Sequence, residues 1–362
     1  MSKIQSIFGV YASSLQAIID NSLDRFAPNW YPKYFGWAPA QQTLTFTSVV
    51  GASRIEAAAS IVNRSSEAPL RARSEMSKYQ GEIPAIKQKF SMREGDYRDF
   101  LALQASSLDE AAKKAQLLDF LFDDVKKAGS APHKRLDIMV LQAISTGKIS
   151  LTVDNNPDGI ILKEDLDLLM PLDNKLSVTT TAERKWRNPL TSTPLTDITN
   201  VVTQARLKGH SFEKILMSMT QAMQLAKSKE VIDSLISFNQ LQKGAAIATI
   251  AKVNEYLQAN LLPPIELVDE VIGIEKDGVI NTIRPWQEGN ISFIPSGKLG
   301  VIKNAVCLEQ MQPVQHVNYA VYNRALLSKW QENDPWAEFT AVELNAFPAF
   351  EAIDKVYILN VD

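Results

Sequence analysis

The sequence has few of the residues from which catalytic and metal sites are built. It contains one cysteine, Cys307, and three histidines, His133, His210 and His316, in 362 residues. A single cysteine excludes an intramolecular disulfide and a thiolate metal cluster. The histidines have no second histidine or cysteine at three- or four-residue spacing, so no closed metal site is predicted. We expect Cys307 to be a packing residue. His133, which follows Pro132 at a predicted helix start, is expected to face solvent.

Long hydrophobic runs and glycine-rich phosphate loops are missing as well. No run approaches the roughly 18 apolar residues of a membrane span, and the chain opens without a secretory signal. We therefore expect no membrane association and folding in a reducing cytoplasm. No phosphate-binding glycine motif occurs, and no cofactor is predicted. The net charge of −3 argues against a broad basic surface that neutralises phosphates, although the protein can still lie near nucleic acid. The length and the 45% hydrophobic content suit two or three folding units.

Aromatic residues and prolines crowd the end of the N-terminal region. A short amphipathic helix is predicted over residues 4–18. The following stretch, 26–39, should resist regular structure because of its prolines, yet it is too apolar to remain solvated. We expect it to lie along a surface of this subunit or of a neighbour. Its candidate contact residues are Trp30, Tyr31, Tyr34, Phe35 and Trp37.

Residues 51–93 carry charges of both signs and few large apolar side chains. This pattern predicts a long, strand-rich excursion that cannot form a core of its own and therefore needs a partner. A solvated surface hairpin is the alternative. The charged candidates for contacts with another subunit are Arg64, Glu67, Arg71, Arg73, Glu75, Lys78, Glu82, Lys87 and Lys89.

The remaining chain mixes helices and strands. A capping box at 107–110 predicts a helix to Gly129, and a second helix is expected from Pro132 to Gly147. A strand, turn and strand are predicted over 149–163. After a helix start at Pro194, the sequence predicts helices over 220–237 and 245–260. Strands are predicted near 215–218, 265–268, 271–274, 290–295, 338–344 and 355–361.

Two short motifs admit a chemical interpretation beside a structural one. Residues 154–165 match the first positions of a calcium loop, but Pro157 and the absence of a glutamate at the last position favour a simple hairpin turn. The triplet Lys185-Trp186-Arg187 alternates base and aromatic as nucleic-acid sites do, although a surface contact is the more common role.

Two stretches of the sequence resemble the lambda-type major capsid protein E family of tailed bacteriophages. The first, 61–90, contains a Pro-x-x-x-Arg segment and an Ile-Pro-x-Ile-Lys segment that look like the extended hairpin loop of that family. The second, 329–340, contains an Asp-Pro-x-x-Glu-Phe-Thr string with a tryptophan shortly upstream. Residues 290–300 are similar to the family's strand before the last loop. The resemblance runs from about residue 45 to the end of the chain.

The resemblance implies an α+β fold, the tailed-phage major capsid fold (Hong Kong 97-like). In this sequence it implies an N-terminal arm over 1–50 and an extended loop over 51–93. A peripheral domain over 94–190 would hold a spine helix near 132–147 and be completed by 335–362, including the last strand. An axial domain would occupy 191–334.

The implied function is that of a virion structural protein, not an enzyme. The chain would self-assemble in the host bacterial cytoplasm into hexamers and pentamers of an icosahedral head around double-stranded DNA. Burial of the arm aromatics would drive association, and the loop charges would fix its register. The implied partners are further copies, a separate scaffolding protein, a portal, an optional decoration protein, and DNA by non-specific proximity. Alternatives are an encapsulating nanocompartment, a tail component, or a hydrolase with its site within 191–334.

Overall fold

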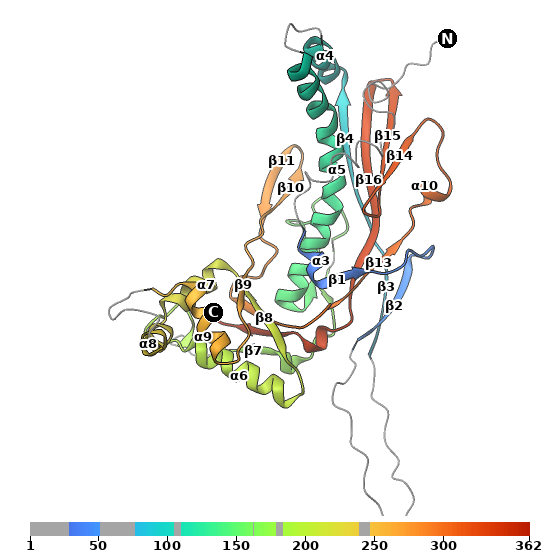
Figure 1. Cartoon of the computed structure of the whole chain (residues 1–362). Helices are drawn as coiled ribbons and strands as arrows, with labels where there is room; N and C mark the ends of the chain where they lie inside the picture. Colours follow the sequence, from blue (N-terminus) through green and yellow to red (C-terminus); the bar gives the residue numbers. More distant parts are fainter. Residues whose placement is uncertain (1–28, 51–76, 105–109, 162, 179–183, 239–246) are drawn as a thin grey trace, which may run out of the picture.

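The computed structural model describes residues 29–50, 77–104, 110–161, 163–178, 184–238 and 247–362 (Figure 1). The predicted helix over 4–18, the capping box at Ser107 and most of the predicted loop lie outside these residues. Among the described helices, none is both long enough and apolar enough to cross a bilayer.

A long helix and a six-stranded sheet form the first body of the molecule. The helix is α5 (Glu110–Thr146), and it packs against β4, β15 and β16. Five of its strands follow the order β1-β13-β16-β15-β14, and the sixth, β4, also pairs with β16. Its strands are β1 (Phe35–Trp37), β4 (Ala85–Arg93), β13 (Gly300–Ala305), β14 (Asn318–Tyr322), β15 (Ala325–Asn333) and β16 (Trp336–Phe350).

Helix α5 is continuous where the sequence predicts two helices. Pro132 lies inside it and removes one backbone hydrogen bond, which costs about 3 kcal/mol in an isolated helix. The side chains of Leu136, Val140 and Ile144, which follow the proline, are fully buried in the first core. We attribute the persistence of the helix to this packing, since burying one such side chain contributes about 1.5–3 kcal/mol.

A five-stranded sheet and four helices form the second body. The sheet order is β7-β17-β12-β8-β9. Its strands are β7 (Lys175–Ser177), β8 (Phe212–Met217), β9 (Ile265–Leu267), β12 (Asn290–Pro295) and β17 (Tyr357–Asn360). The helices are α6 (Pro194–Leu207), α7 (Met219–Lys227), α8 (Lys229–Ser237) and α9 (Ile250–Ala259). The helix start at Pro194 and the strand at 290–295 are confirmed, whereas the predicted helix over 220–237 is two helices.

The five-stranded sheet separates the two cores. Alternate side chains of a strand point to opposite faces. Accordingly Leu216 and Ile294 belong to the core beneath α5, while their neighbours Ile215 and Phe293 belong to the core beneath α6–α9. The Ser292 hydroxyl donates to the Ile144 carbonyl at 2.8 Å, which ties the sheet to the C-terminal end of α5.

The sheets divide the chain differently from the predicted domains. Residues 300–333, expected in the axial unit, form β13, β14 and β15 of the first body because each pairs within the ladder that contains β16. The last strand, β17, was expected to complete the peripheral unit. In the structure, β17 pairs with β12 and β7 in the second sheet.

Two hairpins and several shorter elements complete the described fold. One hairpin joins β2 (Thr45–Val50) to β3 (Ser77–Glu82), and the other joins β10 (Ile272–Lys276) to β11 (Val279–Ile283). The short elements are α3 (Tyr31–Tyr34), α4 (Glu94–Gln104), α10 (Leu308–Met311), η2 (Leu172–Asn174), η4 (Ile353–Lys355), β5 (Lys148–Ile149) and β6 (Leu166–Asp167).

The described residues of 149–163 do not form the predicted hairpin. Lys148 and Ile149 pair instead with 166–167, and the residues between them are mostly turns. The side chain of Asn155 accepts from the Thr152 N–H at 3.0 Å and donates to the Ser150 carbonyl at 2.9 Å. The Asn155 side chain thus forms hydrogen bonds with backbone groups that would pair with a second strand in a hairpin.

Candidate subunit-contact surfaces

The aromatic segment of the predicted arm lies in the core of its own chain. Tyr31, Tyr34 and Phe35 are 1%, 2% and 3% exposed, and α3 and β1 give the segment regular structure. The expectation that these three side chains supply contacts to a neighbour is therefore corrected, because they have no surface to offer in this conformation. Trp30 and Trp37 are half-buried and keep part of their surface.

Polar contacts fix this segment on α5. The backbone N–H groups of Trp30 and Tyr31 both donate to Asp137 Oδ1 at 2.8 Å. The Tyr31 hydroxyl and His133 Nδ1 share a hydrogen bond of 2.9 Å, and Trp30 Nε1 donates to Glu270 at 3.0 Å. The attachments to Asp137 and His133 set the register of the segment along α5, and Glu270 holds Trp30 from the connection between β9 and β10.

Burial perturbs the two titratable groups of α5 at this attachment. Burial raises the pKa of the Asp137 carboxyl to about 7, although the Tyr31 and Trp30 N–H groups and Lys134 act in the opposite direction. Burial lowers the pKa of the His133 imidazole to about 4. The expectation that His133 faces solvent is wrong, because its side chain is 1% exposed between Tyr31 and Trp37.

The base of the predicted extended loop is a β hairpin that leaves the body of the molecule (Figure 1). Strands β2 and β3 pair in register from Thr45 opposite Glu82 to Val50 opposite Ser77. Phe46 stacks on Phe347 at 5.4 Å, which anchors the base to β16. Strand β4, also assigned to the loop by the sequence, instead pairs with β16 over nine residues.

The charged candidates are divided between described and undescribed parts of the chain. Arg64, Glu67, Arg71, Arg73 and Glu75 lie outside the described residues. Of the four in described strands, Lys78 pairs through its backbone with Val49, and Glu82 is exposed. Lys87 forms an ion pair of 2.6 Å with Glu343, and the Lys89 ammonium lies 4.5 Å from the Phe339 ring centre. The last two are thus engaged on the surface of their own sheet.

Neither short motif of the sequence forms the chemical site considered for it. Trp186 is fully buried in the second core, and its Nε1 donates to Asp197 at 3.0 Å. Trp186 therefore offers no stacking platform, whereas the neighbouring Arg187 is exposed. In the described part of the chain, no three His, Cys, Asp or Glu side chains are grouped closely enough to hold a metal ion. Cys307 is buried, as predicted, at 1% exposure.

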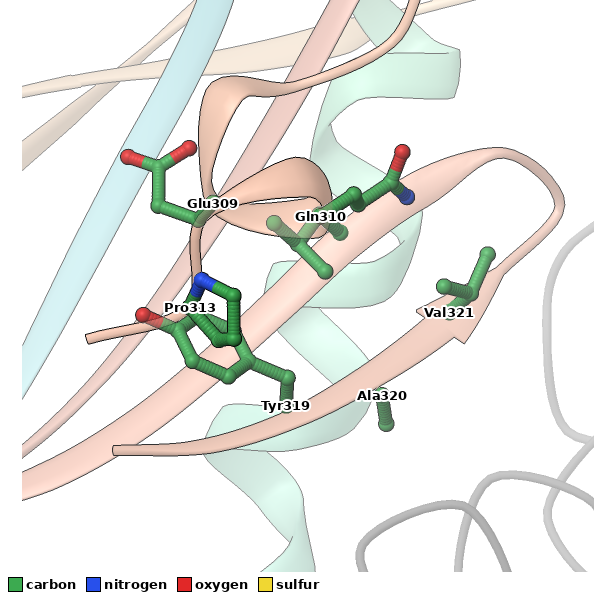
Figure 2. A pocket seen from close by; sticks show the side chains of 7 residues that line it. Glu309, Gln310, Pro313, Tyr319, Ala320 and Val321 are labelled. Carbon is green, nitrogen blue, oxygen red and sulfur yellow. The ribbon is translucent and has the colours of Figure 1, made fainter. Parts of the chain in front are cut away.

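Sequence reasoning missed two surface features of the first body. One is the complete β10–β11 hairpin, of which only the first strand was predicted, although the pair Asp277-Gly278 is a recognised hairpin signal. The other is a pocket of about 470 Å³ between α10 and the strands β14 and β15 (Figure 2). It is lined by residues of α10, of the segment that follows α10 and of the two strands, and no motif in the sequence indicates it.

Two packed bodies with an arm on the long helix and a projecting hairpin define the tailed-phage major capsid fold, the Hong Kong 97-like fold. A protein of E. coli CFT073 described as a prophage capsid protein superimposes with a TM-score of 0.57 at 15% identity, over 96% of this chain and 97% of that one. A phage-related protein of Bordetella bronchiseptica RB50 gives 0.52 at 10% identity, over 96% and 97%. The profile of phage major capsid protein E matches residues 28–361, and the chain belongs to this family of structural virion proteins. No curated protein matches the sequence.

Proposed function

We propose that the chain forms the hexamers and pentamers of an icosahedral phage head that encloses double-stranded DNA. The observation that carries this proposal is the family match, which spans both bodies, the arm segment and the hairpin. Assembly would take place in the cytoplasm of the bacterial host. The proposed partners of such a shell are a scaffolding protein and a portal, with a decoration protein as an optional third.

The chain's architecture supports this proposal through the parts that lie outside its cores. The β2–β3 hairpin extends away from both bodies, and Phe46 and Ile83 at its base pack in the first core. A strand pair without a third strand or a covering helix is marginally stable in water. We infer that the hairpin and residues 51–76 act as the extended loop and are stabilised on a neighbouring subunit.

The two bodies would correspond to the two domains of a capsid subunit. We propose that the first body is the peripheral domain, with α5 as its spine helix, and that the second body is the axial domain. On this assignment β13–β16 belong to the peripheral domain and β17 to the axial domain, as their pairing supports.

Expression alone and together with a scaffolding protein tests the assembly proposal. Negative-stain microscopy and sedimentation should show closed shells or hexameric capsomers in at least one condition. A stable monomer in both conditions would contradict the proposal. Closed particles that hold a protein cargo in place of DNA would instead indicate a nanocompartment.

Charge reversal in the loop tests its role as a contact. We expect Arg71→Glu/Arg73→Glu to abolish shell formation while the monomer still unfolds at the wild-type urea concentration, because like charges across a contact oppose association. Lys227→Glu/Lys229→Glu, an exposed pair with the same spacing on α7 and α8, controls for the change in net charge. Normal shells from the Arg71/Arg73 variant would show that the loop is a solvated hairpin.

A further inference from the structure

The β10–β11 hairpin presents apolar side chains at its tip. Its base is fixed on α5, because Ile272 and Ile274 pack on Ile138. The turn residues Asp277 and Gly278 have φ values of 50° and 77°, as a tight two-residue turn with positive φ at both positions requires. The next two residues, Val279 and Ile280, are 60% and 67% exposed. The hairpin is therefore anchored at its base and exposes two β-branched apolar side chains at its tip.

The pocket between α10 and β14 is a complementary apolar surface. Pro313, Tyr319, Val321 and Leu326 are among the side chains that line it. Figure 2 shows Pro313 beside Tyr319, and Val321 farther along the strand. Three further apolar side chains are exposed on the adjoining segment, namely Leu308, Met311 and Val314.

Charge on the two features is complementary as well. Glu309 lines the pocket, and its Oε2 is buried without a hydrogen-bond partner among the described residues. On the hairpin, the exposed Lys276 lies directly opposite Val279 in the ladder. A lysine ammonium delivered beside Val279 would supply the missing donor to Glu309. Lys87, the cation near Glu309 in the same chain, is paired with Glu343 at 2.6 Å.

We propose that the pocket of one copy receives the tip of the β10–β11 hairpin of the next copy. The hairpin tip and the pocket belong to the same chain but lie on opposite flanks of the first body, the hairpin beside α5 and the pocket beyond β14 (Figure 1). The occupant is therefore a second copy. Among the described elements, the hairpin of a chain does not reach the pocket of the same chain in this arrangement. A contact between two different patches of identical subunits is head-to-tail, and it closes into a ring when the rotation per subunit permits. The inference rests on the proposed assembly function and names one of its contacts.

Disulfide trapping tests this contact. In assembled Ile280→Cys/Val321→Cys protein, oxidation should give a ladder of covalent oligomers that ends at a ring of five or six chains. A mixture of the two single variants should give dimers only. The native Cys307 does not compete, since burial raises the pKa of its thiol to about 12 and the thiolate is the reactive form.

The matched control is Ile280→Cys/Leu207→Cys, which places the second cysteine on α6 at a residue that is 81% exposed. It should give no ladder. Assembled particles in which Ile280→Cys/Val321→Cys gives no interchain disulfide, or in which the control crosslinks equally, would overturn the inference alone. Absence of assembly by the wild-type chain would instead overturn the proposed function.

A charge exchange provides an independent measurement. Lys276→Glu should reduce the capsomer fraction in sedimentation, because two carboxylates then meet in an apolar pocket. Adding Glu309→Lys in the same chain should restore it. Both substituted side chains are at the surface features described and outside the two cores, so the urea unfolding curves should remain those of the wild type. A double variant that assembles no better than Lys276→Glu would contradict the charge contact.

Discussion

The two bodies differ in the kind of side chain that they bury. In the first body, His133, Asp137, Lys329 and Glu338 are between 0% and 2% exposed, although each can carry a charge. In the described part of the second body, Asp197 is the comparable buried group, at 6% exposure. The first body therefore buries several ionisable groups, whereas the described polar side chains buried in the second body are mostly uncharged.

At Asp137 the buried charge joins segments that are far apart in sequence. Asp137 binds the backbone of Trp30 and Tyr31, which lie more than 100 residues before it. Asp197 instead binds Trp186, eleven residues before it. Apolar contacts are non-directional, so they do not by themselves fix the register of a distant segment on a helix. Hydrogen bonds to buried polar groups do fix this register, because they are directional, but burying those groups costs desolvation free energy.

The largest expected effect comes from the buried ion pair of the first body. Lys329 Nζ and Glu338 Oε1 lie 2.8 Å apart, and both side chains are 2% exposed. Lys329→Met should lower the free energy of unfolding by about 3–5 kcal/mol, because it leaves a buried carboxylate without its counter-ion. Urea unfolding at neutral pH measures this. The double variant Lys329→Met/Glu338→Met should recover most of the loss.

The second body offers a matched control at the same distance. Lys214 and Glu266 also lie 2.8 Å apart, but their side chains are 23% and 32% exposed. Lys214→Met should cost less than about 1 kcal/mol, because solvent screens the pair and Lys33 still binds Glu266. Equal losses for Lys329→Met and Lys214→Met would show that burial is not what separates the two bodies.

Asp137 and His133 should make opposite contributions to the pH dependence of the free energy of unfolding. The raised pKa of Asp137, about 7 against 3.8 unfolded, makes the folded chain bind the extra proton, so this stabilisation is lost as pH rises from about 4 to 7. The lowered pKa of His133, about 4 against 6.5, makes the unfolded chain bind the extra proton, so this stabilisation grows between about pH 4 and 6.5. The two slopes oppose each other in the wild type.

Replacing either side chain should reveal how the other one changes the free energy of unfolding with pH. For Asp137→Asn, the free energy of unfolding should rise between pH 4.5 and 6.5 by up to about 3 kcal/mol, at about 1.4 kcal/mol per pH unit. For His133→Gln it should fall over the same interval. Urea unfolding of both variants and the wild type at the two pH values measures these changes. Parallel pH profiles for all three proteins would rule out the compensation.

The sequence predicts local structure better than the contacts that join distant segments. The start of α6 at Pro194 and the strand at 290–295 are visible in short patterns of proline and apolar residues. The burial of His133 and Lys329 is not, because neither residue's neighbours in sequence show which strand or arm covers it. Proline at 132 predicts a helix end by local rules, and the packing that overrides it comes from the sheet.

The same distinction applies to the candidate contacts. Composition singled out the aromatics of the arm, yet an apolar side chain fits the core of its own chain and a neighbour's surface equally well. Only the structure shows that Tyr31, Tyr34 and Phe35 are used internally. Conversely, Val279 and Ile280 have the composition of an ordinary buried strand, and the structure shows them exposed.

The smallest expected effect on stability concerns Lys87, whose side chain is 60% exposed beside Glu343 at 17%. Lys87→Ala should change the free energy of unfolding by less than about 1 kcal/mol, because the exposed partner is screened by solvent. If β4 also faces another subunit, the same variant should lower the capsomer fraction without moving the urea midpoint. Sedimentation and urea unfolding of one preparation separate the two roles. An unchanged capsomer fraction would remove Lys87 from the subunit contact, since its ion pair would then act within the sheet alone.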